Sequence, residues 1–153
     1  MKFANEQEKE IFESAVAANI DTIVAAGAKE KYNHYGIYCI KVDGVIVYVG
    51  KARDMLKRVA QHMAEIEMNH DKNMYNVLRE LKENHHIGFD VLTDTTEGDD
   101  DEMGHAEAYA IRHHHPCLNI QYPHLDNYMR YDYCKRAKTI TPKEVEEILD
   151  NYK

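Results

Sequence analysis

A guanidinium and an imidazole lie one helical turn apart at Arg58 and His62. Residues four apart share one face of a helix, and the planar guanidinium is suited to binding phosphate. Glu107 falls in register with the apolar residues of a later predicted helix, where a carboxylate is costly unless it is paired or binds a cation. A hard oxygen ligand of this kind suits Mg²⁺, which keeps most of its waters and adds substrate phosphate. Phosphate binding beside a metal ligand is what hydrolysis of a phosphodiester requires.

Two tyrosine motifs precede this pair, Gly36-Ile37-Tyr38 and Tyr48-Val49-Gly50, and their tyrosines are ten residues apart. After Glu107 the chain continues with Pro116-Cys117-Leu118-Asn119. In order and spacing, these elements resemble the GIY-YIG nuclease family, with YVG in place of YIG. The resemblance covers about residues 35–120 and leaves out both terminal helices. Any one motif of three residues is weak evidence, whereas six elements in the right order are strong.

The resemblance implies a metal-dependent endonuclease that hydrolyses phosphodiester bonds of DNA by a single in-line attack of water. The cofactor it implies is Mg²⁺, with Mn²⁺ as a substitute. In this scheme Arg58 binds and neutralises the scissile phosphate, and Glu107 holds the metal that stabilises the leaving 3′ oxygen.

The same resemblance assigns roles to five further residues. We favour Tyr48 as general base, with Tyr38 positioning the water or the phosphate. An ordinary phenol has a pKa of about 10, so the base needs help near neutrality, and Lys51 would lower its pKa by its charge. His62 would move a proton or contact phosphate, and Asn119 would brace the site through backbone hydrogen bonds.

A catalytically inactive protein of the same fold, acting as a nucleic-acid-binding or protein-interaction module, is the alternative. The net charge of −8 favours it, because acidic proteins bind nucleic acid less well. Nine acids lie between residues 83 and 110, which hold no Lys or Arg, and the remaining residues are nearly balanced in charge. The acidity is therefore local, and a basic face elsewhere is open to a polyanion. No sequence feature indicates whether the protein distinguishes RNA from DNA by the 2′-hydroxyl, so RNA is a further possible substrate.

Hydrophobic periodicity predicts the elements that must position these groups. An apolar stripe predicts a helix within residues 1–30 that stops at Gly27, and Thr141-Pro142-Lys143-Glu144 predicts the capped start of a last helix. The other predicted elements are strands over 35–42, 45–50 and 87–92, and helices over 52–68, 72–83 and 101–114. The fold class is α/β (α+β): a mainly antiparallel three-stranded sheet flanked by helices, with extra helices at both ends.

Asp43-Gly44 predicts a hairpin between the two tyrosine motifs. A strict two-residue turn would point Tyr38 and Tyr48 to opposite faces of the sheet. A three-residue loop over 42–44 with a bulge would pair Lys41 with Val45 and set the tyrosines across from each other. Because a shared site needs both hydroxyls, we predict the three-residue loop. The residues then expected on the other, apolar face are Ile37, Cys39, Val45, Val47 and Val49.

The size of 153 residues, with 44% hydrophobic and 30% charged, is typical of one globular domain. We divide it into an N-terminal helical extension (1–30), the nuclease domain (31–120), and a segment rich in tyrosine and basic residues with the C-terminal helix (121–153). The terminal helices would cover the core, join two copies as a homodimer or contact another partner. Three cysteines without paired spacing, a charged N-terminus and no apolar run long enough to span a bilayer indicate a reducing, cytoplasmic location without membrane contact.

Overall fold

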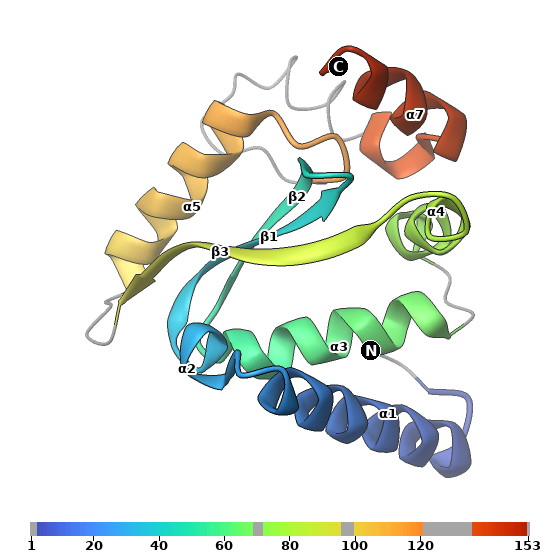
Figure 1. The fold of residues 1–153 in the computed structure, drawn as a ribbon, viewed down its shortest axis with the longest axis vertical. Coiled ribbons are helices and arrows are strands. Elements are labelled where there is room, and N and C mark those ends of the chain that lie inside the picture. Colours follow the sequence, from blue (N-terminus) through green and yellow to red (C-terminus); the bar gives the residue numbers. More distant parts are fainter. Residues whose placement is uncertain (1–2, 69–71, 96–99, 121–135, 153) are drawn as a thin grey trace.

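The computed structural model describes residues 3–68, 72–95, 100–120 and 136–152. Within these ranges three antiparallel strands form an open sheet in the order β2-β1-β3, with helices around it (Figure 1). The predicted α+β class is therefore confirmed. The helices are α1 (Glu6–Ala25), α2 (Lys29–Tyr32), α3 (Met55–Glu67), α4 (Asn73–Leu81), α5 (Asp100–His114) and α7 (Pro142–Asp150), and the strands are β1 (Tyr35–Val42), β2 (Val45–Ala52) and β3 (Ile87–Thr95).

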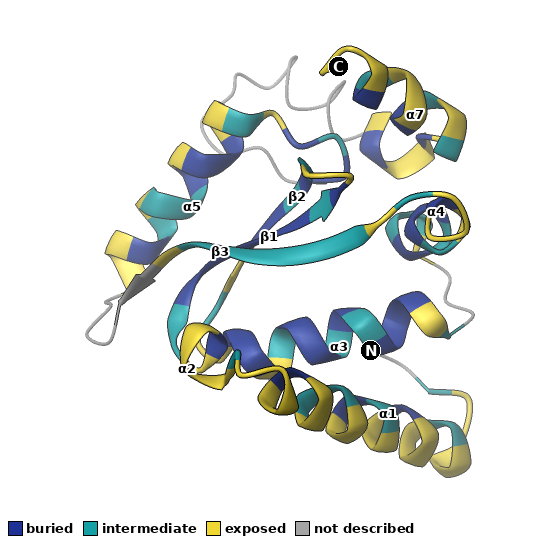
Figure 2. Cartoon of the chain, in the orientation of Figure 1, coloured by how far each residue is buried: buried dark blue, intermediate teal, exposed yellow. Residues whose placement is uncertain are grey.

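Helices α3 and α1 form two successive layers on one face of the sheet (Figure 1). Met55 and Val59 of α3 are buried in one cluster with Phe12, Val16 and Ile23 of α1. The buried residues of both helices therefore face inward, as the dark blue segments of Figure 2 show, while the outer side of α1 is exposed. The apolar stripe read in the sequence of α1 is thus a packing surface against α3.

Helix α5 covers the opposite face of the sheet, where Met103 and Ile111 pack against Ile37, Cys39 and Val49. A third cluster of buried residues joins α4 and α7 to the hairpin end of the sheet. The sheet is consequently covered on both faces, and groups carried by α3 and by α5 approach it from opposite sides.

The helix ends follow the signals in the sequence. Gly27 has a positive φ of 79°, directly after the residue that caps α1, so the predicted stop is confirmed. At α7 the Thr141 hydroxyl accepts from the Glu144 amide at 3.2 Å, and the Glu144 side chain accepts from the Thr141 amide at 3.3 Å. This capping box was predicted and satisfies two backbone donors at the start of the helix.

The β1–β2 hairpin differs from the prediction. Asp43 and Gly44 both have positive φ, 50° and 83°, and form a two-residue turn that pairs Val42 with Val45, so the predicted three-residue loop is wrong. A β-bulge nevertheless puts Tyr48 on the same face of the sheet as Tyr38. The register shifts between Ile40 and Lys41, so that Val47 is the extra residue of β2.

The bulge has two consequences for the faces of the sheet. Tyr38 lies across from Gly50, and Tyr48 lies across from Ile40, so both tyrosines share the α3 face after all. Val45 and Val47 pack with Ile40 and not with the α5-facing cluster, which corrects their predicted side.

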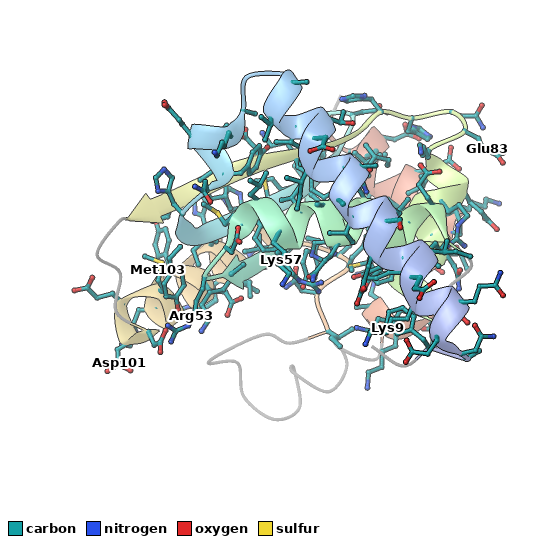
Figure 3. All side chains as sticks on the ribbon, turned by 90° about the horizontal axis from the view of Figure 1, so that it is seen from below. Lys9, Arg53, Lys57, Glu83, Asp101 and Met103 are labelled. Carbon is teal, nitrogen blue, oxygen red and sulfur yellow. The ribbon has the colours of Figure 1, made fainter. Side chains whose placement is uncertain are left out.

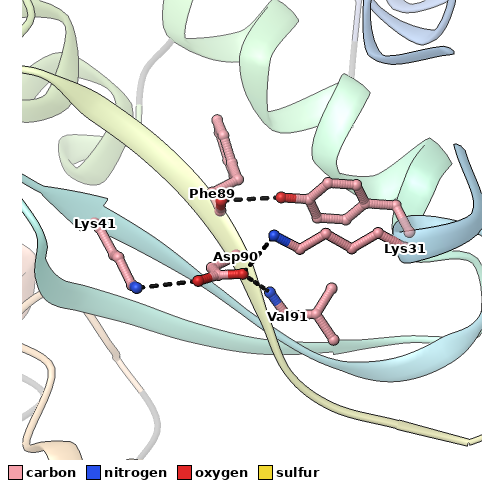
Figure 4. Close-up of polar contacts among 6 residues, drawn as sticks. Lys31, Lys41, Phe89, Asp90 and Val91 are labelled. Carbon is pink, nitrogen blue, oxygen red and sulfur yellow. Dashed lines mark hydrogen bonds and ion pairs between the residues drawn. The ribbon is translucent and has the colours of Figure 1, made fainter. Parts of the chain in front are cut away.

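The outer edge of β3 is fastened to the short helix α2 (Figure 4). The Tyr32 hydroxyl donates to the Phe89 carbonyl at 2.9 Å. The Asp90 carboxylate binds the amines of Lys31 at 2.7 Å and Lys41 at 3.1 Å. The Tyr32 bond satisfies one backbone carbonyl of this edge strand, and the two ion pairs tie the strand to α2 and to β1.

Most of the tyrosine- and base-rich stretch, residues 121–135, lies outside the described residues. The boundaries at residues 30 and 121 stay predictions, although α1 packs on α3 and α7 on α4. Among the helices in the described ranges, none combines the length and the apolar character needed to cross a membrane.

Candidate active site

Tyr38 and Tyr48 lie side by side on the α3 face, with ring centroids 6.3 Å apart. Tyr38 is almost completely buried, whereas Tyr48 keeps part of its surface exposed and lines a cavity. The two tyrosines therefore share one face, as predicted, but the predicted direct pairing across the strands is wrong, because Tyr38 is paired with Gly50 and Tyr48 with Ile40. Only one of the two phenols is open to a ligand.

The glycines of the two motifs make room for this arrangement. A Cβ at residue 50 would collide with the Tyr38 hydroxyl, which lies over the Gly50 backbone. A Cβ at residue 36 would collide with the Thr93 carbonyl and the Met55 side chain. Glycine is required at both positions because the Tyr38 ring, β3 and α3 all pack onto the β1–β2 backbone.

Helix α3 brings Arg58 and His62 to the tyrosines. The helix starts where the Asp54 side chain accepts from the Lys57 amide at 3.1 Å, and from there the i, i+4 pair projects toward the sheet. His62 is fully buried, and its Nε2 lies 2.7 Å from the Tyr38 hydroxyl. Arg58 is partly exposed, and its Nη1 donates to Gln61 Oε1 at 3.3 Å.

Asn119 makes the predicted hydrogen bonds to the backbone, and it makes them to β2. Its Oδ1 accepts from the Val49 amide at 2.9 Å, and its Nδ2 donates to the Val49 carbonyl at 2.8 Å. The adjacent Leu118 amide donates to the Val47 carbonyl at 2.9 Å, at the bulge. Residues 118–119 therefore satisfy the outer edge of β2 and fix the backbone on both sides of Tyr48.

Glu107 and Lys51 lie on the other face of the sheet. Lys51 pairs with Ile37, whose side chain packs under α5, and Glu107 is one turn from both Met103 and Ile111. Burial raises the pKa of Glu107, and the nearby Lys51 amine opposes that rise. The structure thus places Lys51 beside the carboxylate and not beside the tyrosine base to which sequence reasoning assigned it.

The start of α5 is anchored to the end of the sheet. Arg53 Nη2 donates to Asp100 Oδ2 at 2.6 Å, and the Tyr35 hydroxyl donates to Asp100 Oδ1 at 2.7 Å. Figure 3 labels Arg53 together with Asp101 and Met103 of α5. These contacts orient the helix that carries Glu107 two turns further on.

A cavity of about 250 Å³ opens beside Tyr48 and Arg58. Lys72, Lys138 and Tyr75 also line it, and Met74, Leu118 and Ile120 give it apolar walls. Three cations and two phenols around one hollow form a setting for an anionic ligand with an apolar or aromatic portion. Glu107 is not one of the residues that line this cavity.

Tyr48 is electrostatically coupled to both sides of the site. Burial raises the pKa of the Tyr48 phenol, the positive charge of Arg58 opposes that rise, and the negative charge of Glu107 adds to it. Tyr48 therefore lies within the fields of the cation on α3 and of the carboxylate on α5. Four of the seven predicted site residues lie close together: Tyr38, Tyr48, Arg58 and His62. Asn119 binds the backbone of β2. Glu107 acts on Tyr48 through its charge from the α5 side, and Lys51 acts on Glu107.

Tyr75 and Glu65 are site residues that sequence reasoning missed. His62 Nδ1 lies 2.9 Å from the Tyr75 hydroxyl, and the Glu65 carboxylate raises the pKa of the Tyr75 phenol, beyond the effect of burial, as an acceptor and through its charge. Tyr75 falls on the inward face of its helix, where the sequence signal is that of an ordinary core position. Glu65 lies three residues after His62 and seven after Arg58, and that shared helix face was a signal that could have found it.

Only Glu107, among the predicted site residues, is a metal ligand candidate. A single partly buried carboxylate fits Mg²⁺, which binds through one or two carboxylates with waters and substrate phosphates. The described residues contain no cluster of three or more His, Cys, Asp and Glu side chains, the donor set that Zn²⁺ requires. No protein-family model, curated protein or solved structure matches the chain.

Proposed function

We propose that the protein is a Mg²⁺-dependent endonuclease of the GIY-YIG type that hydrolyses DNA phosphodiester bonds by one attack of water. The observation that carries the proposal is the meeting of Tyr48, Arg58 and the Tyr38–His62 pair beside a cavity lined by further cations. These groups come from β1, β2 and α3.

The cavity is the proposed binding place of the nucleotide next to the scissile bond. Arg58 offers a planar fork to the phosphate, and Lys72 and Lys138 add positive charge on the far side. The apolar walls and the Tyr75 ring suit the sugar or the base. This local concentration of cations offsets the net charge of −8, much of which lies on and before α5.

Glu107 is the proposed metal ligand. Mg²⁺, when bound, would stabilise the negative charge that develops on the leaving 3′ oxygen. The charge of the Lys51 amine opposes the rise in the pKa of Glu107 that burial causes and so favours the ionised carboxylate, and this role replaces the one that the sequence suggested for Lys51. DNA phosphate would complete the coordination, as is common for Mg²⁺ in proteins.

Tyr48 is the proposed general base because it is the phenol that reaches the cavity. Its pKa is raised by burial, so it is protonated at neutral pH and must pass its own proton on while it accepts one from water. Arg58 supplies the cation that favours the ionised phenol, and Tyr38 with His62 provides a path away from it.

A plasmid-nicking assay with and without Mg²⁺ tests the proposal. The wild-type chain should nick supercoiled DNA with Mg²⁺ and with Mn²⁺, and the Glu107→Gln variant should lose at least about 100-fold in rate. Asp101→Asn is the matched control, because Asp101 is an exposed acid on the same helix. It should nick at the wild-type rate.

No nicking by a folded wild-type chain would overturn the nuclease proposal and favour the inactive binding module. Nicking that persists in Glu107→Gln would remove the metal assignment. A parallel RNA substrate tests the choice of DNA. The reducing, cytoplasmic location belongs to the same proposal and is supported by the unpaired thiols of Cys39 and Cys117.

A further inference from the structure

His62 is held between two phenols in the interior. Its Nε2 lies 2.7 Å from the Tyr38 hydroxyl, its Nδ1 lies 2.9 Å from the Tyr75 hydroxyl, and its side chain has no exposed surface. Burial, reinforced by the charges of Arg58 and Lys72, lowers the pKa of His62 well below its ordinary value. The imidazole is therefore neutral near pH 7, with one nitrogen as donor and the other as acceptor.

Glu65, the neighbour of Tyr75, determines which ring nitrogen of His62 carries the proton. Glu65 is buried on α3, and among the described residues its Oε2 has no hydrogen-bond partner. Its carboxylate favours the protonated Tyr75 phenol as an acceptor. When Tyr75 directs its proton to Glu65, its oxygen accepts from His62 Nδ1–H, and the bare Nε2 accepts from the Tyr38 hydroxyl.

The packing of α4 on α3 maintains this chain of contacts. Arg79 Nε donates to the Ile66 carbonyl at 2.7 Å, and its Nη2 donates to the Glu65 carbonyl at 3.2 Å. Arg79 thus satisfies carbonyls at the end of α3 and fixes the distance between the helix of Tyr75 and the helix of His62.

We infer that Tyr75 and Glu65 are positioning residues that hold His62 as its Nδ1–H tautomer, so that His62 accepts a proton from Tyr38 during phosphodiester cleavage. The inference rests on the proposed nuclease function and deepens it. It adds two residues from outside the tyrosine motifs to the reaction, and it gives the path a direction, from the cavity toward the buried carboxylate.

The proton balance of the step is complete. As water attacks, its oxygen forms the new bond to phosphorus, the bond to the 3′ oxygen breaks, and the departing oxygen keeps the electron pair. The water proton passes to Tyr48, whose ring centroid lies 6.3 Å from that of Tyr38. In the proposed relay one proton moves from Tyr48 to Tyr38, then along the hydrogen bonds from Tyr38 to His62 and from His62 to Tyr75, and last from Tyr75 to Glu65. Glu65 gains one proton, and the phenols and His62 end with the number of protons with which they began.

Charged and titratable groups face His62 from each packed element. The charges that act on it are those of Arg58 on α3 and of Lys72, the N-cap residue of α4. The Tyr75 ring faces it from α4 and the Tyr38 and Tyr48 rings from the sheet, and Glu65 of α3 acts on Tyr75. The two cations oppose a second proton on His62, which favours onward transfer to Glu65 over storage of the proton on the imidazole.

Nitrogen NMR of the ¹⁵N-histidine-labelled full chain tests the tautomer without any substrate. The wild type should show His62 protonated on Nδ1 and bare on Nε2, with the signal assigned through a His62→Gln variant. In Tyr75→Phe the Nδ1 acceptor is gone, so the major tautomer should become Nε2–H, which donates to Tyr38. Tyr109→Phe, an exposed tyrosine at 64% relative accessibility, is the matched control and should leave the His62 signals unchanged.

A wild-type His62 protonated on Nε2 would overturn the inference even if Tyr75→Phe failed to fold. So would a folded Tyr75→Phe variant with the wild-type tautomer. Kinetics supply the second readout: Glu65→Gln should lower kcat for DNA nicking at least about 10-fold with KM unchanged, because Glu65 does not line the cavity. An unchanged kcat would refute the proton path. A wild type with the expected tautomer but no nicking would overturn the proposed nuclease function and leave the tautomer assignment standing.

Discussion

Replacing Asn119 by alanine should destabilise the fold through one strand residue. The substitution removes two hydrogen bonds, of 2.9 and 2.8 Å, from the amide and the carbonyl of Val49. Asn119 is 5% exposed and Val49 is 1% exposed, so the Val49 amide and carbonyl would lose their hydrogen-bond partners in a buried environment. An unsatisfied buried backbone group costs about 1–3 kcal/mol. Because β2 is an edge strand that water can approach after the truncation, we expect a total loss of about 2–4 kcal/mol.

Urea denaturation followed by circular dichroism measures this loss. With an m-value of about 2 kcal/mol per molar urea, the midpoint should fall by roughly 1–2 M. Asn84→Ala is the matched control, because Asn84 is exposed, and its midpoint should stay within about 0.3 M of the wild type. Amide hydrogen exchange adds a local readout: the Val49 amide should be protected in the wild type and exchange much faster in Asn119→Ala. A stability loss below about 0.5 kcal/mol with Val49 still protected would refute the bracing role.

Three further predictions concern packing, pH and salt. Gly50→Ala should cost about 1–3 kcal/mol in urea denaturation, because the new Cβ displaces the Tyr38 hydroxyl; an unchanged midpoint would contradict the close approach. The hydrogen bond to Asp43 raises the pKa of His85, so its contribution of about 0.5 kcal/mol is present below pH 6.5 and lost as pH rises through the raised pKa. His85→Gln should therefore destabilise more at pH 5.5 than at pH 8.5, and an equal loss at both would be contrary evidence. Lys138→Gln should weaken DNA binding and lower the slope of log affinity against log salt by about 1; an unaltered slope would place that lysine outside the interface.

Much of the fold follows from local sequence signals. The helix stop at Gly27 and the capping box at Thr141 depend on neighbours within a few residues, and both are present in the structure. The bracing role of Asn119 was also predicted, and its two bonds to Val49 confirm that contact. These features need only short-range chemistry or one strong motif.

In the β1–β2 hairpin, the turn depends on neighbouring residues, whereas the bulge depends on a residue far along the chain. Asp43 and Gly44 accept positive φ and form the tight turn that their types favour, so the predicted three-residue loop is wrong. The bulge that returns Tyr48 to the face of Tyr38 is stabilised at the Val47 carbonyl by the amide of Leu118. No local pattern near the turn reveals a partner so far along the chain.

Lys51 could have been placed correctly from the sequence. It lies three residues after Tyr48 in a strand, and an odd spacing sends side chains to opposite faces. Tyr75 could not, because it lies among the inward-facing apolar residues of its helix. Glu65 could have been singled out, because it is an acid three residues after His62 and seven after Arg58, on the same face of α3. The contact of Tyr75 with His62 depends on how α4 packs on α3, which the Arg79 bonds to α3 carbonyls establish.

In the proposed mechanism, Arg58 on α3 and Glu107 on α5 act together on one phosphodiester bond from the two sides of Tyr48. A double-mutant cycle in Mg²⁺-dependent cleavage of branched, nicked and linear DNA tests this most directly, with Arg58→Gln, Glu107→Gln and the double variant. On the best substrate we expect each single variant to lose at least about 100-fold in kcat/KM and the double variant to be little worse than either. Wild-type cleavage by either single variant, or losses that multiply fully in the double variant, would contradict a shared catalytic site.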